Sequence, residues 1–170
     1  YPGLTVAVEG ATEEGEPDVY FPSGTRNYCR VCPADQIQGG AGARWAFNAQ
    51  GRTKAYVLDD NSLYGKGVAT VFKNTFEELG GEILGAESYD VSLDNYQTLM
   101  TSIADKGPDI VYVGATVENN PAKILQDMRS VMSVDDVIYM GSDGQTNQAF
   151  VDGAADAANG AYLTFGGYTP

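Results

Sequence analysis

Short apolar runs alternate along this chain with longer segments in which apolar residues recur every three or four positions. The runs have the length of strands, and the longer segments have the period of amphipathic helices. The predicted strands are residues 28–32, 54–59, 82–88, 109–114, 136–141 and 161–165. The predicted helices begin at Asp35, after Gly67, at Asp94, at Pro121 and at Gln145. This alternation predicts an α/β fold, a three-layer α/β/α sandwich with a mainly parallel sheet, whose strand order the pattern does not give.

Local signals predict how three of these helices begin. Asp94 followed by Gln97 resembles a capping box, and Asn120 before Pro121 resembles a cap with proline at the first helical position. Asp35 is predicted to cap the helix that it begins, which carries an apolar series at four-residue spacing, namely Ile37, Ala41, Trp45 and Ala49.

The 170 residues are expected to form one domain, since this length suits a single core. Residues 1–27 are rich in Gly, Pro and Glu and show neither period, so we expect an irregular lead-in and a regular core over about 28–165. The chain begins at Tyr1 and stops at Pro170, and we expect both ends to be cut from a longer protein.

The charge balance disfavours one class of partner. Ten basic residues stand against 23 acidic ones, a net charge of −13, and binding to nucleic acid needs clustered basic charge. The favoured interpretation of this acidity is a self-repelling surface, and a cationic ligand is the alternative. No apolar run reaches the roughly 18 residues that a membrane span needs.

Catalytic and cofactor signatures are missing from the sequence. The chain contains no histidine, which removes histidine-based nucleophilic triads and histidine metal sites. Phosphate-loop and calcium-loop patterns do not occur. Gly65 and Gly67 lack the third glycine of a dinucleotide fingerprint and are expected to open a tight turn into the next helix. We therefore expect no enzyme activity, no cofactor and no metal.

Two cysteines, Cys29 and Cys32, lie in a predicted strand. Residues three apart in a strand are about 10 Å from each other, too far for a disulfide without a local turn. Two thiols are the favoured interpretation, and a redox pair is the alternative.

A candidate binding edge follows from the predicted sheet. Ligands of open α/β sheets bind outside the carboxyl ends of the strands. Four candidate ligand-binding residues lie at these ends: Tyr64, Ala115, Thr116 and Asp143. Tyr64 is either a ligand contact or a staple at the start of a helix, and Asp143 is either a partner for an ammonium group or a turn residue.

Several segments together resemble the type 1 periplasmic binding proteins, in particular the leucine/isoleucine/valine-type receptors of ABC transporters. They are NYCRVCPADQIQGGAGA, VLDDNSLYGKGVATVFKNTFEELGG, PDIVYVGA and VIYMGSDG. The resemblance implies two α/β lobes that close on a ligand, of which this chain is one, with residues 1–27 leading in from the partner lobe. It also implies that Asp143 and Tyr64 hold a ligand ammonium and that Ala115 and Thr116 line the cleft.

The resemblance implies a solute-binding component that delivers an amino acid of the branched-chain type, or a related amine or amide, to an ABC transporter permease. Such a receptor would be extracytoplasmic, either periplasmic or lipid-anchored at the cell surface. The leucine-type receptors carry a glutamate at the position of Asp143 and a further tyrosine near Thr116, so other amino acids, amides and urea-like compounds stay open as ligands. A ligand-sensing domain of a signalling receptor is the alternative, and an α/β enzyme is the third.

Overall fold

The computed structural model describes residues 22–25 and 35–167. The predicted strand 28–32, both cysteines and almost all of the lead-in 1–27 lie outside these ranges.

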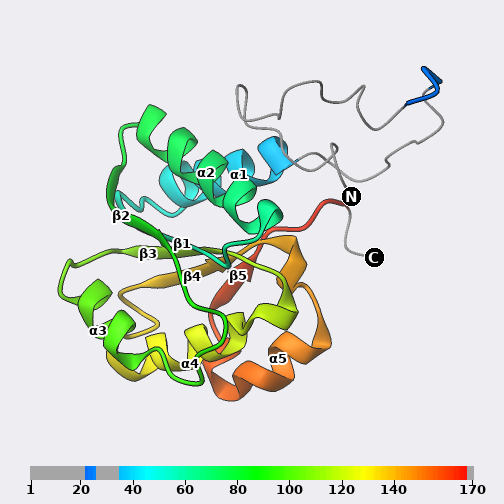
Figure 1. The fold of residues 1–170 in the computed structure, drawn as a ribbon. Helices are drawn as coiled ribbons and strands as arrows, with labels where there is room; N and C mark the ends of the chain where they lie inside the picture. The colour runs from blue at the N-terminus through cyan, green and yellow to red at the C-terminus, as the bar shows by residue number, and fades with distance from the viewer. Residues whose placement is uncertain (1–21, 26–34, 168–170) are drawn as a thin grey trace.

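Five parallel strands form a single sheet in the described part of the chain (Figure 1). They are β1 (Lys54–Asp59), β2 (Glu82–Ser88), β3 (Ile110–Gly114), β4 (Ile138–Gly141) and β5 (Ala161–Leu163). Their order is β2-β1-β3-β4-β5, and every neighbouring pair is parallel. The prediction of a parallel sheet is confirmed, and each strand falls within the predicted range.

Helices cover both faces of this sheet. They are α1 (Asp35–Arg44), which continues as a π-helical turn over Trp45–Ala49, α2 (Leu63–Glu78), α3 (Gln97–Ala104), α4 (Pro121–Val131) and α5 (Gln148–Ala154). Short 3-10 turns occupy Val117–Asn119, Asp143–Gln145 and Ala155–Ala158. Figure 1 shows α1 and α2 on one face and α3, α4 and α5 on the other, so the predicted three-layer sandwich is confirmed.

Each face of the sheet has its own apolar core. Under α1 and α2, the ring of Phe72 stacks on Tyr112 with 4.1 Å between centroids and on Phe76 with 5.5 Å. On the opposite face, Tyr139 of β4 stacks on Phe150 of α5 at 6.0 Å. The sheet is thus buried on both sides, as expected for parallel strands connected by helices.

The predicted capping box of α3 is wrong. The N-cap of this helix is Tyr96, and Asp94 is exposed. The backbone N–H of Tyr96 instead donates to Asp127 Oδ2 of α4 at 2.6 Å. Asp127 also accepts a hydrogen bond from Lys123 Nζ at 2.6 Å. A buried carboxylate 31 positions away therefore replaces the local cap, because it satisfies the helix terminus from inside the core.

Two other helix starts differ in part from the prediction. Pro121 occupies the first turn of α4 as predicted, but the side chain of Asn120 donates to the carbonyl of Val91 at 2.9 Å rather than capping the helix. The last predicted helix starts at Gln148 rather than Gln145, because Asn147 accepts from the N–H of Ala149 at 2.9 Å and caps it there.

The apolar series of the first helix is only partly buried: Trp45 is half-buried against the core, whereas the members of the series before it face outward. Ile37 is 60% exposed, and Ala41 is also exposed. The helix packs instead through its glycines, and a methyl group at Gly39 would lie 2.6 Å from the carbonyl oxygen of Val68 in α2. Close approach of two helix backbones needs small residues at the contact, so the glycine face is buried and Ile37 and Ala41 are left outside.

Tyr112 and Tyr139, both 0% exposed, provide a matched test of buried hydrogen bonds. The hydroxyl of Tyr139 donates to Gln145 Oε1 at 2.7 Å, whereas the hydroxyl of Tyr112 has no hydrogen-bond partner in the described ranges. We expect Tyr139→Phe to lower the free energy of unfolding by about 1–2 kcal/mol and Tyr112→Phe to leave it unchanged or raise it. Urea denaturation of both variants measures this, and equal losses would contradict the assignment of these two hydroxyls.

Candidate functional site

The four predicted site residues come together at the carboxyl edge of the sheet. Tyr64 lies in the first turn of α2, Ala115 and Thr116 follow β3, and Asp143 follows β4. Gly144 lies among them, because a methyl group on it would be 2.7 Å from the carbonyl oxygen of Ala115 and 3.0 Å from Tyr64 Cε1. Three loops therefore meet at one point, as parallel strands require.

The Tyr64 side chain is fixed by polar contacts on several sides. Its hydroxyl donates to Asp143 Oδ1 and accepts from the backbone N–H of Gly144 at 3.1 Å. Gln38 Oε1 of α1 lies 3.4 Å from the same hydroxyl. Burial, and then the hydrogen bond to Asp143, raise the pKa of Tyr64 well above its usual range, so the phenol stays a proton donor at neutral pH.

Ala115 and Thr116 hold the loop after β3 rather than presenting chemistry of their own. Ala115 is fully buried, and its backbone N–H and C=O are both bonded to Ser142 Oγ, at 3.2 and 3.0 Å. Thr116 is half-buried, and its N–H donates to Asp60 Oδ2 at 3.1 Å. The Ala115 side chain is thus part of the core, and Thr116 is the member of this pair that reaches the surface.

Asp60 organises this edge, and sequence reasoning missed it. Its carboxylate is 4% exposed and accepts four hydrogen bonds. Oδ1 accepts from the N–H and the hydroxyl of Ser62 at 3.1 and 2.5 Å. Oδ2 accepts from the N–H of Thr116 and from Asn119 Nδ2 at 2.7 Å. The sequence signal was an acid directly after a buried strand, but its distant partners could not be identified from it.

The two glycines near Tyr64 lie inside α2, so the prediction that they form the turn before the helix is wrong. The turn lies one step earlier, where Asn61 adopts a φ of 63° and Ser62 accepts the N–H of Gly65 at 2.9 Å as the N-cap. Ser62 is itself bonded to Asp60, so the buried carboxylate fixes the helix start that carries Tyr64.

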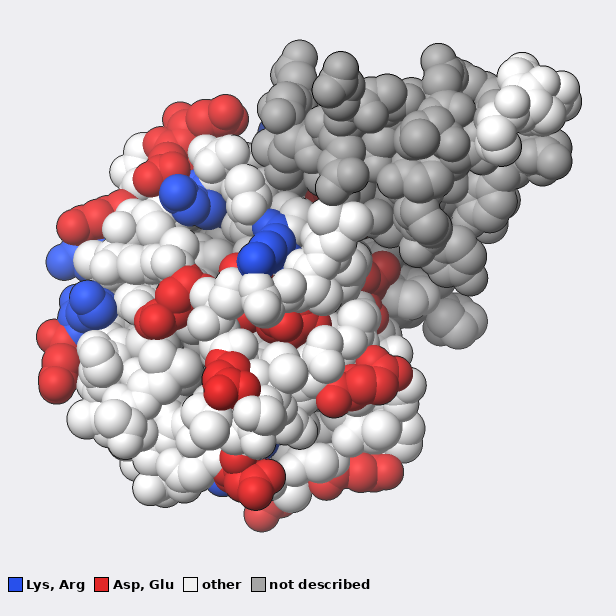
Figure 2. Space-filling model, viewed as in Figure 1, with Lys and Arg blue, Asp and Glu red and all other residues white. Residues whose placement is uncertain are grey.

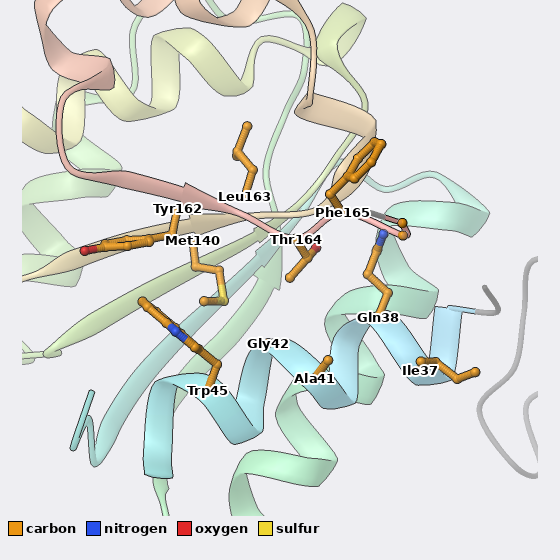
Figure 3. A pocket seen from close by; sticks show the side chains of 12 residues that line it. Ile37, Gln38, Ala41, Gly42, Trp45, Met140, Tyr162, Leu163, Thr164 and Phe165 are labelled. Atoms are coloured by element: carbon orange, nitrogen blue, oxygen red, sulfur yellow. The ribbon is translucent and has the colours of Figure 1, made fainter. Parts of the chain in front are cut away.

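Two hollows border the site. One, of about 510 Å³, lies on the β2 side of Asp60 and is lined by Asp60, Asn61, Ser62, Ser88, Tyr89, Asp90 and Val91. The other, of about 830 Å³, is an apolar groove between α1 and β5 (Figure 3). Trp45 and Tyr162 lie 4.6 Å apart within it, and Gln38 lines its other end. Gln38 is therefore shared between the groove and the contact with Tyr64.

The charges on the face that Figure 2 shows do not form a basic site. Figure 2 shows acidic side chains spread over the visible face, with few basic ones. Within residues 22–25 and 35–167, His, Cys, Asp and Glu form no cluster of three that could hold a metal ion. None of the helices in these ranges is long and apolar enough to cross a bilayer. The arrangement offers one oriented carboxylate beside an aromatic ring, which suits recognition of a small cation.

The chain is similar to known proteins over most of its length. The sequence profile of the family described as periplasmic binding protein matches residues 5–170. The Leu/Ile/Val-binding protein homolog 1 of Brucella abortus is 26% identical over 147 residues, which are 86% of this chain and 39% of that protein. The chain thus spans about two-fifths of the length of this relative.

Solved structures show the same fold. The leucine-binding protein of Thermotoga maritima superposes with a TM-score of 0.72 at 22% identity, over 84% of this chain and 41% of that one. A solute-binding protein of an ABC transporter from Rhodopseudomonas palustris, in complex with p-hydroxybenzoic acid, superposes with a TM-score of 0.67 at 18% identity. This match covers 76% of this chain and 35% of that one. These likenesses concern the fold of one lobe.

Proposed function

This chain belongs to the periplasmic binding protein family, and from that premise we propose that it is one lobe of a two-lobed solute receptor that binds an amine-bearing solute for an ABC transporter. The family is one of solute-binding proteins rather than enzymes. The observation that carries the proposal is the oriented pair of Tyr64 and Asp143 at the carboxyl edge of the sheet.

The ligand class follows from the charge at this pair. A carboxylate with an open oxygen attracts an ammonium group and repels another carboxylate. Relatives are named for leucine, isoleucine and valine, and one structural neighbour holds p-hydroxybenzoic acid, which has no ammonium. Asp143 favours the first kind of ligand, an amino acid of the branched-chain type or a related amine.

The mechanism would be closure of two lobes on the ligand. A ligand that contacts both lobes binds the closed state more tightly and shifts the population toward it. We further propose that the partner lobe supplies the groups for the ligand's carboxylate, that a permease receives the solute, and that the receptor works outside the cytoplasm. None of the described residues favours the sensing alternative over transport.

We expect this chain to bind leucine, isoleucine or valine weakly through Asp143, because one lobe alone cannot exclude water from the ligand. Titration followed by ¹H–¹⁵N NMR should shift the signals around Tyr64, Thr116 and Asp143 at roughly millimolar ligand. Asp143→Asn should weaken the binding at least about tenfold, which is the loss of about one charged hydrogen bond.

Asp152→Asn is the matched control, since it removes the same charge from an exposed position on α5. Equal loss in both variants would mean that net charge, not Asp143, drives binding. Preference for p-hydroxybenzoate over the amino acids would overturn the proposed ligand class. Micromolar or tighter binding would contradict the need for a second lobe.

A further inference from the structure

The two oxygens of the Asp143 carboxylate have different surroundings. Oδ1 accepts the hydrogen bond from the Tyr64 hydroxyl. Oδ2 makes no hydrogen bond with any residue that the structure describes. A ligand would therefore share Oδ1 with Tyr64, whereas Oδ2 is fully available to it.

We propose, resting on the function above, that Tyr64 makes Asp143 selective for ammonium groups over guanidinium and amidinium groups. A guanidinium is a planar fork that pairs best with a carboxylate through two parallel hydrogen bonds, one to each oxygen. An ammonium is a compact point charge that needs only one oxygen from that carboxylate. A carboxylate oxygen can accept two hydrogen bonds, as Asp60 Oδ1 does. A guanidinium in two-point contact would nevertheless have to share Oδ1 with the Tyr64 phenol. An ammonium bound to Oδ2 would not, so the hydrogen bond from Tyr64 weakens the two-point contact and leaves the one-point contact intact.

Displacing Tyr64 to free the second oxygen would disturb a well-supported side chain. Its hydroxyl accepts from the N–H of Gly144 at 3.1 Å, so leaving Asp143 breaks two hydrogen bonds. Gln38 of α1, only 7% exposed, places its Oε1 3.4 Å from the same hydroxyl. Tyr64 is the second residue of α2, two positions after Ser62, the N-cap that Asp60 fixes. The phenol is thus held where it occupies one acceptor position of Oδ1.

Methylammonium and methylguanidinium test this selectivity, because both carry one positive charge and one methyl group. We expect ¹H–¹⁵N NMR titration of the wild-type chain to give a dissociation constant for methylammonium that is at least about fivefold lower than that for methylguanidinium. In Tyr64→Phe both oxygens become available, so the ratio of the two dissociation constants should fall to about one or reverse.

Tyr56→Phe provides the matched control. Its hydroxyl also donates to a carboxylate, Glu87 Oε1 at 2.5 Å, but on strands β1 and β2 away from Asp143. The ratio should stay at the wild-type value in this variant.

Three results would overturn the proposal. The first needs only the wild-type chain: if it binds methylguanidinium as tightly as methylammonium, or more tightly, the selectivity is refuted. Amine recognition by Asp143 would still stand. An unchanged ratio in Tyr64→Phe would assign the selectivity to another group. If Asp143→Asn alters the binding of neither cation, the proposed function falls and the selectivity falls with it.

Discussion

Gly65→Ala should lower the free energy of unfolding by about 2–4 kcal/mol, because α2 begins in direct contact with the end of β3. A methyl group at Gly65 would lie 2.5 Å from the carbonyl oxygen of Gly114 and 2.1 Å from Asp60 Oδ1. Neither atom is free to move, since the first belongs to a central strand and the second to a buried carboxylate that accepts four hydrogen bonds. Urea denaturation followed by circular dichroism measures the loss.

Gly67→Ala is the matched control two residues later in the same helix. There the nearest atom to an added methyl group is Asp35 Oδ2 at 3.7 Å, an ordinary contact. Alanine is the better helix former by about 1 kcal/mol, so this variant should be as stable as the wild type or more stable. If both variants lose stability equally, the close approach of α2 and β3 is not the cause.

Asp60→Ala should also lower the free energy of unfolding by about 3 kcal/mol or more, since it leaves four buried donors without their acceptor. The loop after β3 and the start of α2 both depend on this carboxylate, so the loss should reach the candidate site. Beyond the lower free energy of unfolding, the NMR signals of Thr116 and Tyr64 should shift or broaden in the folded variant.

Asp59→Ala serves as the comparison for Asp60. Asp59 is half-buried and accepts from the N–H of Asn61 at 2.8 Å and from Ser88 Oγ at 2.6 Å. Removing the Asp59 carboxylate should lower the free energy of unfolding by less than half as much as Asp60→Ala does, because water can reach the donors that it leaves. Similar losses at positions 59 and 60 would mean that burial of Asp60 does not govern its contribution.

The candidate site could be predicted from the sequence as far as its location. Tyr64, Thr116 and Asp143 each follow a predicted parallel strand, and parallel strands end at one edge. The sequence could not predict which of these side chains are buried or which hydrogen bonds they make. The phenol of Tyr64 is bonded to Asp143, and Ala115 is buried; both depend on loops that meet only after the sheet has formed.

The sequence by itself determined the elements of the fold, because strands and helices follow from the period of apolar residues and from local signals such as Pro121. Only the tertiary structure decided the strand order, the glycine face on which α1 packs, and the carboxylates that hold the loops. Asp127 caps a helix 31 positions away, and Asp60 accepts bonds from Thr116 and Asn119, 56 and 59 positions away. Such partners are chosen by burial, since a buried charge must find its donors wherever the packed chain brings them.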